Sequence, residues 1–212
     1  WSGGLPFDHI YDYSYDGIMR SYQDSLIRFG INQIDLLLIH DLDPLFHTPK
    51  EQKDHEKDLM TTGIKALEEL KSNGDIQAFG MGINQKESLS TLAQNLPLDF
   101  ALVAMPYTLI DQESLHDGMA KCQRNATSVI IGAPFASGIL ATGAGQNSKY
   151  AYQNATSDLQ KKVNSIEKVC FSHKVSLKAA ALQFVLAHPA VVSTIPGAVN
   201  EEQILENISL IF

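Results

Sequence analysis

The segment IDLLLIHDLDP, residues 34–44, contains an apolar run that leads into a histidine and two carboxylates. The run from Ile34 to Ile39 is interrupted by one acid, and His40, Asp41 and Asp43 follow it. A nearly continuous apolar run is typical of a strand that is covered on both faces of a parallel sheet, whereas a half-exposed strand alternates apolar and polar residues. The segment therefore predicts a buried parallel strand with polar side chains at its carboxyl end.

Four further short apolar runs follow in the chain, and amphipathic segments separate them. The runs are IQAFGMGI (76–83), FALVAM (100–105), VIIGAP (129–134) and VVSTI (191–195). The segments with apolar residues at helical spacing lie around 18–29, 59–70, 84–92, 111–122, 159–170, 177–188 and 201–208. Alternating strands and helices indicate an α/β fold with a parallel sheet. No GxGxxG sequence opens a helix after the first strand, so a Rossmann domain is poorly supported.

Capping residues set the predicted starts of several helices. Ser176 and Asn200 each precede a helical pattern and can accept a hydrogen bond from the first turn. Asn84 and Glu87 have the spacing of a capping box. Asp111 is placed to cap the helix that would follow it. These residues predict four helices that begin directly at the named positions.

The length of the chain suits most of a barrel. A complete (β/α)8 barrel usually has about 250 residues, and this chain has 212. Five strand–helix units therefore predict one incomplete barrel domain over residues 1–212. The segment ATGAGQNSKYAYQNATS (141–157) is small, polar and rich in turn residues, so we expect a long mobile loop there.

Composition excludes several classes of partner. The net charge is −8 and no Lys/Arg cluster is present, which argues against a nucleic-acid surface. No apolar run approaches the roughly 20 residues that cross a bilayer, and no secretion leader is visible, so we expect a cytoplasmic protein without a membrane partner. Cys122 and Cys170 take core-like helical positions, which predicts reduced, buried thiols.

Active sites in barrels lie at the carboxyl ends of the strands. That rule selects His40, Asn84, Tyr107 and the segments APFASGIL (133–140) and IPGAVN (195–200). From spacing alone, His40 fits a ring that hydrogen-bonds a neighbouring carbonyl as well as it fits a functional group. A metal site is a third alternative, because the residues that follow the first strand carry nitrogen and oxygen ligands; these residues are His40, Asp41, Asp43 and His47. All four follow one strand, so no metal site is predicted.

The segment DYSYDGIMRSYQDSLIRFGINQIDLLLIHDLD (12–43) resembles the aldo-keto reductases, and in particular their branch of NAD-dependent aldose 1-dehydrogenases and pyridoxal 4-dehydrogenases. The segments AFGMGIN (78–84), MPYTLID (105–111), APFASGIL (133–140) and IPGAVNEEQILEN (195–207) follow in the order of that family. The resemblance covers nearly the whole chain. It implies an α/β fold, a (β/α)8 TIM barrel of which about strands 4 to 8 are present, and a nicotinamide cofactor held without a Rossmann domain.

The same resemblance assigns roles to residues at the strand ends. His40 matches the histidine of the family's catalytic Asp, Tyr, Lys and His, and we expect the other three to precede this chain. Asn84 matches the asparagine that holds the nicotinamide carboxamide. Tyr107 resembles the aromatic residue on which the nicotinamide ring packs, and Ala104 replaces the family's partner glutamine. Asp41 and Asp43 are expected to shape the loop or to support His40 without touching the substrate, and His47 and His55 to lie on the surface.

The remaining assignments concern the rest of the cofactor. The loop beneath the pyrophosphate is represented by Pro134, Phe135, Gly138 and Leu140, and the surroundings of the adenine by Glu206 and Asn207. Relatives that prefer NADP carry a lysine and an arginine where this chain has Gly197 and Gln203. A 2′-phosphate would meet the carboxylates of Glu201, Glu202 and Glu206 without a bidentate partner. We therefore expect NAD, with NADP less favoured.

The resemblance implies an oxidoreductase. The anomeric carbon of an aldose such as L-fucose would give a hydride to the nicotinamide and become a lactone, or an aldehyde would be reduced in the reverse reaction. The expected partner is thus a small sugar or aldehyde. The alternative is a sensor or interaction protein that binds the nucleotide on the same barrel without catalysis, because Tyr11, Tyr13 and Tyr15 do not stand in the family's tyrosine motif.

Overall fold

A computed structural model describes residues 9–151 and 153–212 of the chain. The chain divides into two compact units. The described part of the first comprises residues 9–37 and 44–79, and that of the second comprises 38–43, 80–151 and 153–212. Every residue predicted for the site belongs to the second unit. The prediction of one domain over 1–212 stays a prediction.

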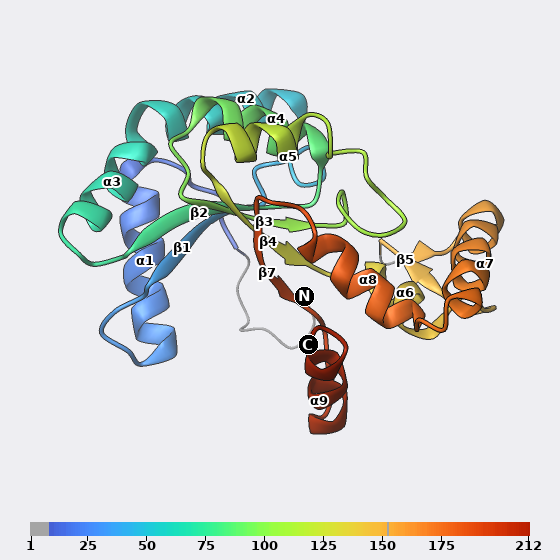
Figure 1. Cartoon of the computed structure of the whole chain (residues 1–212). Helices are drawn as coiled ribbons and strands as arrows, with labels where there is room; N and C mark the ends of the chain where they lie inside the picture. The colour runs from blue at the N-terminus through green and yellow to red at the C-terminus, as the bar shows by residue number, and fades with distance from the viewer. Residues whose placement is uncertain (1–8, 152) are drawn as a thin grey trace. The chain divides into compact units, whose positions relative to one another are not determined.

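In the first unit, helix α1 (Tyr15–Phe29) begins where Ser14 accepts a hydrogen bond from the Gly17 amide, and it ends at Gly30, whose φ is 65°. Helix α2 (Pro49–Asp58) continues through a π-helical turn (Leu59–Gly63) into α3 (Ile64–Ser72). The predicted helix around 59–70 is therefore the later part of a longer one. Figure 1 shows α1 beside α3, and the two are in contact.

The expected strands are all present within a few residues of their predicted bounds. They are β1 (Leu36–His40), β2 (Ala78–Ile83), β3 (Phe100–Ala104), β4 (Ser128–Gly132) and β7 (Val191–Ile195). They form one sheet in the order β1-β2-β3-β4-β7 (Figure 1). The pairs β2–β3, β3–β4 and β4–β7 are parallel. A parallel sheet with sequential strands is the arrangement that the apolar runs predicted.

Helices of the second unit follow these strands. They are α4 (Lys86–Asn95), α5 (Gly118–Arg124), α6 (Ile139–Thr142), α7 (Ser157–Ser172), α8 (Leu177–Leu186) and α9 (Glu201–Ser209). Helix α4 packs beside α5, and α8 contacts both α6 and α7 (Figure 1). Two predicted caps are confirmed: Ser176 accepts from the Ala179 amide and Asn200 from the Gln203 amide.

The other two predicted caps are wrong. Helix α4 begins only after Gln85, which is extended, and no side chain caps it. Asn84 is thus still outside the helix, and the box with Glu87 does not form. Asp111 pairs with Thr108 in a tight bridge and accepts the Tyr150 hydroxyl, so its carboxylate is engaged far from a helix start. Helix α5 begins at Gly118 instead.

The prediction of a long mobile loop over 141–157 is also wrong. A short antiparallel hairpin occupies it, formed by β5 (Lys149–Tyr150) and β6 (Gln153–Asn154). The Tyr150 hydroxyl donates to Asp111 at 2.8 Å and fastens this hairpin to the turn after β3. The hydrogen-bonded tyrosine gives the segment structure that its small, polar composition did not indicate.

Both cysteines are free and buried, as predicted. Burial raises the pKa of the Cys122 thiol to about 11, which makes the reactive thiolate scarce at neutral pH. Among the residues that the structure describes, no helix has the length and apolar character needed to span a membrane.

Candidate active site at the carboxyl edge of the sheet

The register of the sheet brings the predicted strand ends to one edge. Ile83 pairs with Val103, which pairs with Ile131, which pairs with Thr194. The four strands therefore end in one row, and the segments that follow them leave the sheet at the same edge. This edge is the place where barrels and open α/β sheets carry their ligands.

Three strands end in a left-handed residue that is not glycine. Asp41, Met105 and Ala133 directly follow β1, β3 and β4, with φ of 57°, 72° and 50°. Each such residue costs about 1–2 kcal/mol relative to the right-handed conformation. Strained backbone of this kind tends to gather at functional sites. The residue types do not predict these left-handed conformations at Met105 and Ala133, because of the three residues only aspartate adopts a positive φ readily.

His40 lies at the end of β1 with its side chain 57% exposed. Its Nδ1 is 3.1 Å from Oδ2 of Asp41, whose side chain is only 10% exposed. Of the two roles expected for Asp41, shaping the loop or supporting His40, the structure shows contact with His40, because this carboxylate touches the imidazole directly. A buried acceptor on one ring nitrogen fixes how the other nitrogen is presented.

Gly82 supports the same ring from the neighbouring strand. A Cβ at this position would lie 2.9 Å from Cδ2 of His40 and 3.7 Å from Nε2. Contacts under about 3 Å are not tolerated between carbon atoms, so a larger residue would displace the imidazole. The absence of a side chain at Gly82 gives the His40 ring its place over β2.

Asn84 and Tyr107 differ in their accessibility. Asn84 is half-buried and directly follows β2. Tyr107 is only 4% exposed, and its ring stacks on Phe184 at a centroid distance of 5.5 Å, with His188 at 5.6 Å. Burial raises the pKa of the Tyr107 phenol. A nicotinamide ring would have to share Tyr107 with this packing, so the predicted stacking stays a prediction.

In the segment after β4, the backbone is more accessible to a ligand than the side chains are. Pro134, Phe135 and Leu140 are buried, and the last two belong to the apolar core of the second unit. The backbone then passes through three left-handed residues, Ala136, Ser137 and Gly138. No atom lies within 4 Å of where a Cβ of Gly138 would be. A ligand could therefore approach the chain closely at Gly138.

The segment after β7 is held by its own side chains. Gln203 accepts a hydrogen bond from the Val199 amide while Asn200 caps the Gln203 amide. Asn207 is buried and donates to the Gly197 carbonyl at 3.5 Å. These contacts order the loop between β7 and α9, so Gln203 and Asn207 have structural roles beside any contact with a cofactor.

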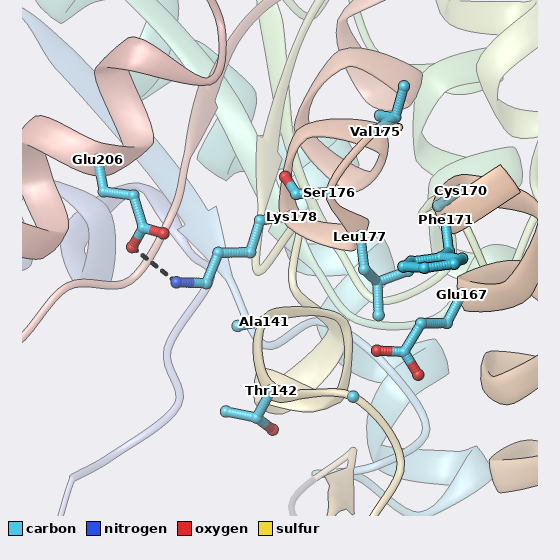
Figure 2. A pocket seen from close by; sticks show the side chains of 11 residues that line it. Ala141, Thr142, Glu167, Cys170, Phe171, Val175, Ser176, Leu177, Lys178 and Glu206 are labelled. Atoms are coloured by element: carbon cyan, nitrogen blue, oxygen red, sulfur yellow. Dashed lines mark hydrogen bonds and ion pairs between the residues drawn. The ribbon is translucent and has the colours of Figure 1, made fainter. Parts of the chain in front are cut away.

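Glu206 pairs with a cation that the sequence did not single out. Lys178 Nζ lies 2.6 Å from its carboxylate, and both line a hollow of about 380 Å³ at the start of α8. Figure 2 shows the pair on one side of the hollow, with Phe171 and Glu167 on the other. The sequence does not indicate this ion pair, because the two residues are 28 positions apart and the segment SLKAAAL has the pattern of an ordinary helix.

The histidines after β1 do not gather around a metal. Within 9–151 and 153–212, no group of three or more His, Cys, Asp or Glu side chains could hold a metal ion. His47, expected at the surface, is buried in the first unit. Its Nε2 is 3.4 Å from the Tyr13 hydroxyl, and its ring contacts those of Tyr11 and His55. Aromatic packing accounts for its burial.

Comparison with known proteins supports the family suggested by these segments. The model of the aldo/keto reductase family matches residues 5–212. The pyridoxal 4-dehydrogenase of Microbacterium luteolum is 36% identical over 98% of this chain and 61% of its own length. The D-threo-aldose 1-dehydrogenase of a Pseudomonas species is 31% identical over 93% of this chain and 57% of its own length.

A solved structure agrees on the fold. An aldo-keto reductase from Bacillus halodurans, in its holo form, superposes with a TM-score of 0.74 at 23% identity, over 95% of this chain and 63% of that one. The chain thus belongs to the aldo/keto reductase family and has its α/β fold of the TIM-barrel type with a parallel sheet. It spans about 61% and 57% of the two curated relatives.

Proposed function

We propose that this chain carries the cofactor half of a nicotinamide-dependent oxidoreductase that oxidises an aldose at its anomeric carbon to a lactone, or reduces a carbonyl in reverse. The observation that carries the proposal is the carboxyl edge of the sheet, where three strands end in left-handed residues and the His40 ring lies beside Gly82 of β2. The printed activities of the relatives, pyridoxal 4-dehydrogenase and D-threo-aldose 1-dehydrogenase, indicate the reaction class. We also propose that these five strands correspond to strands 4 to 8 of the barrel.

Each residue of the edge has a proposed task. His40 would hydrogen-bond the reacting oxygen of the substrate and set its orientation. The Asn84 amide would hold the carboxamide, and the open backbone at Gly138 would lie against the pyrophosphate. Glu206 and Asn207 would border the adenine. A nicotinamide, when bound, supplies a carbon that accepts the hydride.

We propose NAD as the preferred nucleotide. Three charged side chains line the hollow beside α8: two carboxylates, Glu167 and Glu206, and the single cation Lys178, which is already paired. Glu201 and Glu202 add negative charge to the first turn of α9. A 2′-phosphate would meet net negative charge here, whereas a 2′-hydroxyl could donate to a carboxylate.

Isothermal titration calorimetry with NAD and NADP tests this preference. We expect NAD to bind at least tenfold more tightly, which corresponds to about 1.4 kcal/mol. Glu206→Gln should free Lys178 from its ion pair and reduce the difference in affinity between NAD and NADP. Glu167→Gln is the matched control, because it removes a carboxylate from the hollow and leaves the ion pair of Lys178 intact. A tenfold preference for NADP in the unaltered chain would contradict the proposal.

The reaction is tested by His40→Ala in the protein expressed from its whole reading frame. With an aldose and NAD, kcat should fall by about two orders of magnitude because orientation of the reacting oxygen is lost. Nucleotide affinity should stay unchanged. Unaltered turnover in the variant would remove His40 from the mechanism. Tight NAD binding by the unaltered protein without oxidation of any sugar would favour the nucleotide-sensing alternative.

A further inference from the structure

The contact between His40 and Asp41 has a consequence for the substrate. We propose that Asp41 is a positioning residue that holds neutral His40 in the tautomer with its proton on Nδ1, so that Nε2 offers a lone pair to a substrate hydroxyl. The part of this proposal that concerns the substrate rests on the function proposed above. The part that concerns the tautomer rests on the geometry alone.

Neighbouring residues of a strand do not normally pair, because successive side chains point to opposite faces of the sheet. His40 is the last residue of β1, and Asp41 leaves the strand with a φ of 57°. This left-handed turn brings the carboxylate back toward the ring, with Oδ2 at 3.1 Å from Nδ1. The strained backbone at Asp41 therefore has a specific result, which is the contact with His40.

The ring is fixed from two directions. Asp41 meets it at Nδ1, and the bare backbone of Gly82 lies beneath Cδ2, where a Cβ would approach to 2.9 Å. A rotation of the imidazole by half a turn would exchange Cδ2 and Nδ1 and place a carbon against the carboxylate. The contact with Asp41 disfavours that orientation. The side chain of His40 nevertheless remains 57% exposed, so a ligand can reach the ring.

An ionised carboxylate only accepts hydrogen bonds, and a neutral imidazole carries one N–H. When Nδ1–H donates to Asp41, Nε2 is left without a proton and can only accept. A carbonyl substrate has no proton to give, whereas the anomeric hydroxyl of a cyclic aldose does. The tautomer thus favours binding of a substrate that presents a hydroxyl group to Nε2.

Nitrogen NMR on the ¹⁵N-histidine-labelled chain tests the tautomer directly. The spectra should be taken near pH 8. Loss of one set of cross-peaks in His40→Gln assigns the residue, and the other six histidines serve as internal controls. We expect unaltered His40 to show a protonated Nδ1 and a bare Nε2.

Asp41→Asn is the matched variant, because asparagine also tolerates the left-handed region and keeps the size of the side chain. It should move His40 toward a mixture of tautomers, while circular dichroism and the other histidine signals stay unchanged. Asp41→Glu, which restores the charge, should recover part of the Nδ1–H population. A protonated Nε2 in the unaltered chain, or the same tautomer ratio in Asp41→Asn, would overturn the proposal.

A second titration tests the substrate class. An aldopyranose should move the Nε2 signal of His40, and its 1,5-anhydro analogue, which lacks the anomeric hydroxyl, should not. An equal response to both sugars, or to neither, would overturn the hydroxyl assignment. NAD affinity is measured in parallel on the same samples. Failure of NAD to bind while the tautomer is as expected would refute the proposed function and leave the positioning role of Asp41 intact.

Discussion

Two aromatic rings near the carboxyl ends of strands in the same sheet, His40 and Tyr107, have opposite surroundings. Both were predicted to contact the reacting groups. His40 remains largely exposed beside Asp41 and Gly82, whereas Tyr107 is buried against Phe184 and His188. The comparison teaches that a place after a strand brings a side chain to the edge of the sheet, but the neighbouring helices decide whether the side chain faces a ligand or the core.

The largest effect on stability is expected when each ring is removed by substitution with alanine. Tyr107→Ala should lower the free energy of unfolding by about 3–5 kcal/mol, because it leaves a cavity against α8. His40→Ala should change it by less than about 1 kcal/mol, as for most exposed sites. Urea denaturation measures both, and Tyr107→Phe is the control that keeps the ring. Equal losses for the two alanine variants would refute the division into a core ring and a site ring.

A smaller effect is expected from a methyl group added under His40. Gly82→Ala should cost about 1–3 kcal/mol, because the new Cβ overlaps the imidazole and something must shift. Gly145→Ala is the control, since nothing lies within 4 Å of its built Cβ. Thermal or urea denaturation gives the cost, and the NMR signals of His40 report the displacement. An unshifted His40 signal in Gly82→Ala would show that the glycine does not seat the ring.

The smallest effect is a pH dependence on the Tyr107 side. Burial lowers the pKa of His188, so the folded chain binds fewer protons than the unfolded chain at pH values between that lowered pKa and about 6.5. Stability should therefore fall as the pH is lowered through this window, by no more than about 1.4 kcal/mol per pH unit from this residue. Denaturation at several pH values measures the slope. His188→Gln should flatten it, and an unchanged slope would mean that other groups cause it.

Sequence reasoning recovered the parts of the fold that depend on neighbouring residues in the chain. The apolar runs located all five strands of the main sheet, and Ser176 and Asn200 start the helices that they were predicted to start. Local hydrogen bonds and local periodicity determine these features. The carboxyl edge followed from the rule that parallel strands end together.

The features that the sequence did not reveal depend on distant partners or on backbone strain. Phe184, which covers Tyr107, lies 77 positions later, and Lys178 meets Glu206 across 28 positions. The left-handed conformations of Met105 and Ala133 occur at residues that rarely adopt them, so no residue type marks them. The pair of His40 with Asp41 depends on the same kind of turn.

The most direct test of the central claim is a titration of the ¹⁵N-labelled chain with NAD, followed residue by residue by NMR. We expect the amide signals of Asn84, Gly138 and Asn207 to move together with increasing NAD. NADP should move them only at higher concentration, and the signals of α1 should keep their positions. Shifts confined to α1, or the same three residues responding to NADP at lower concentration than to NAD, would contradict the claim.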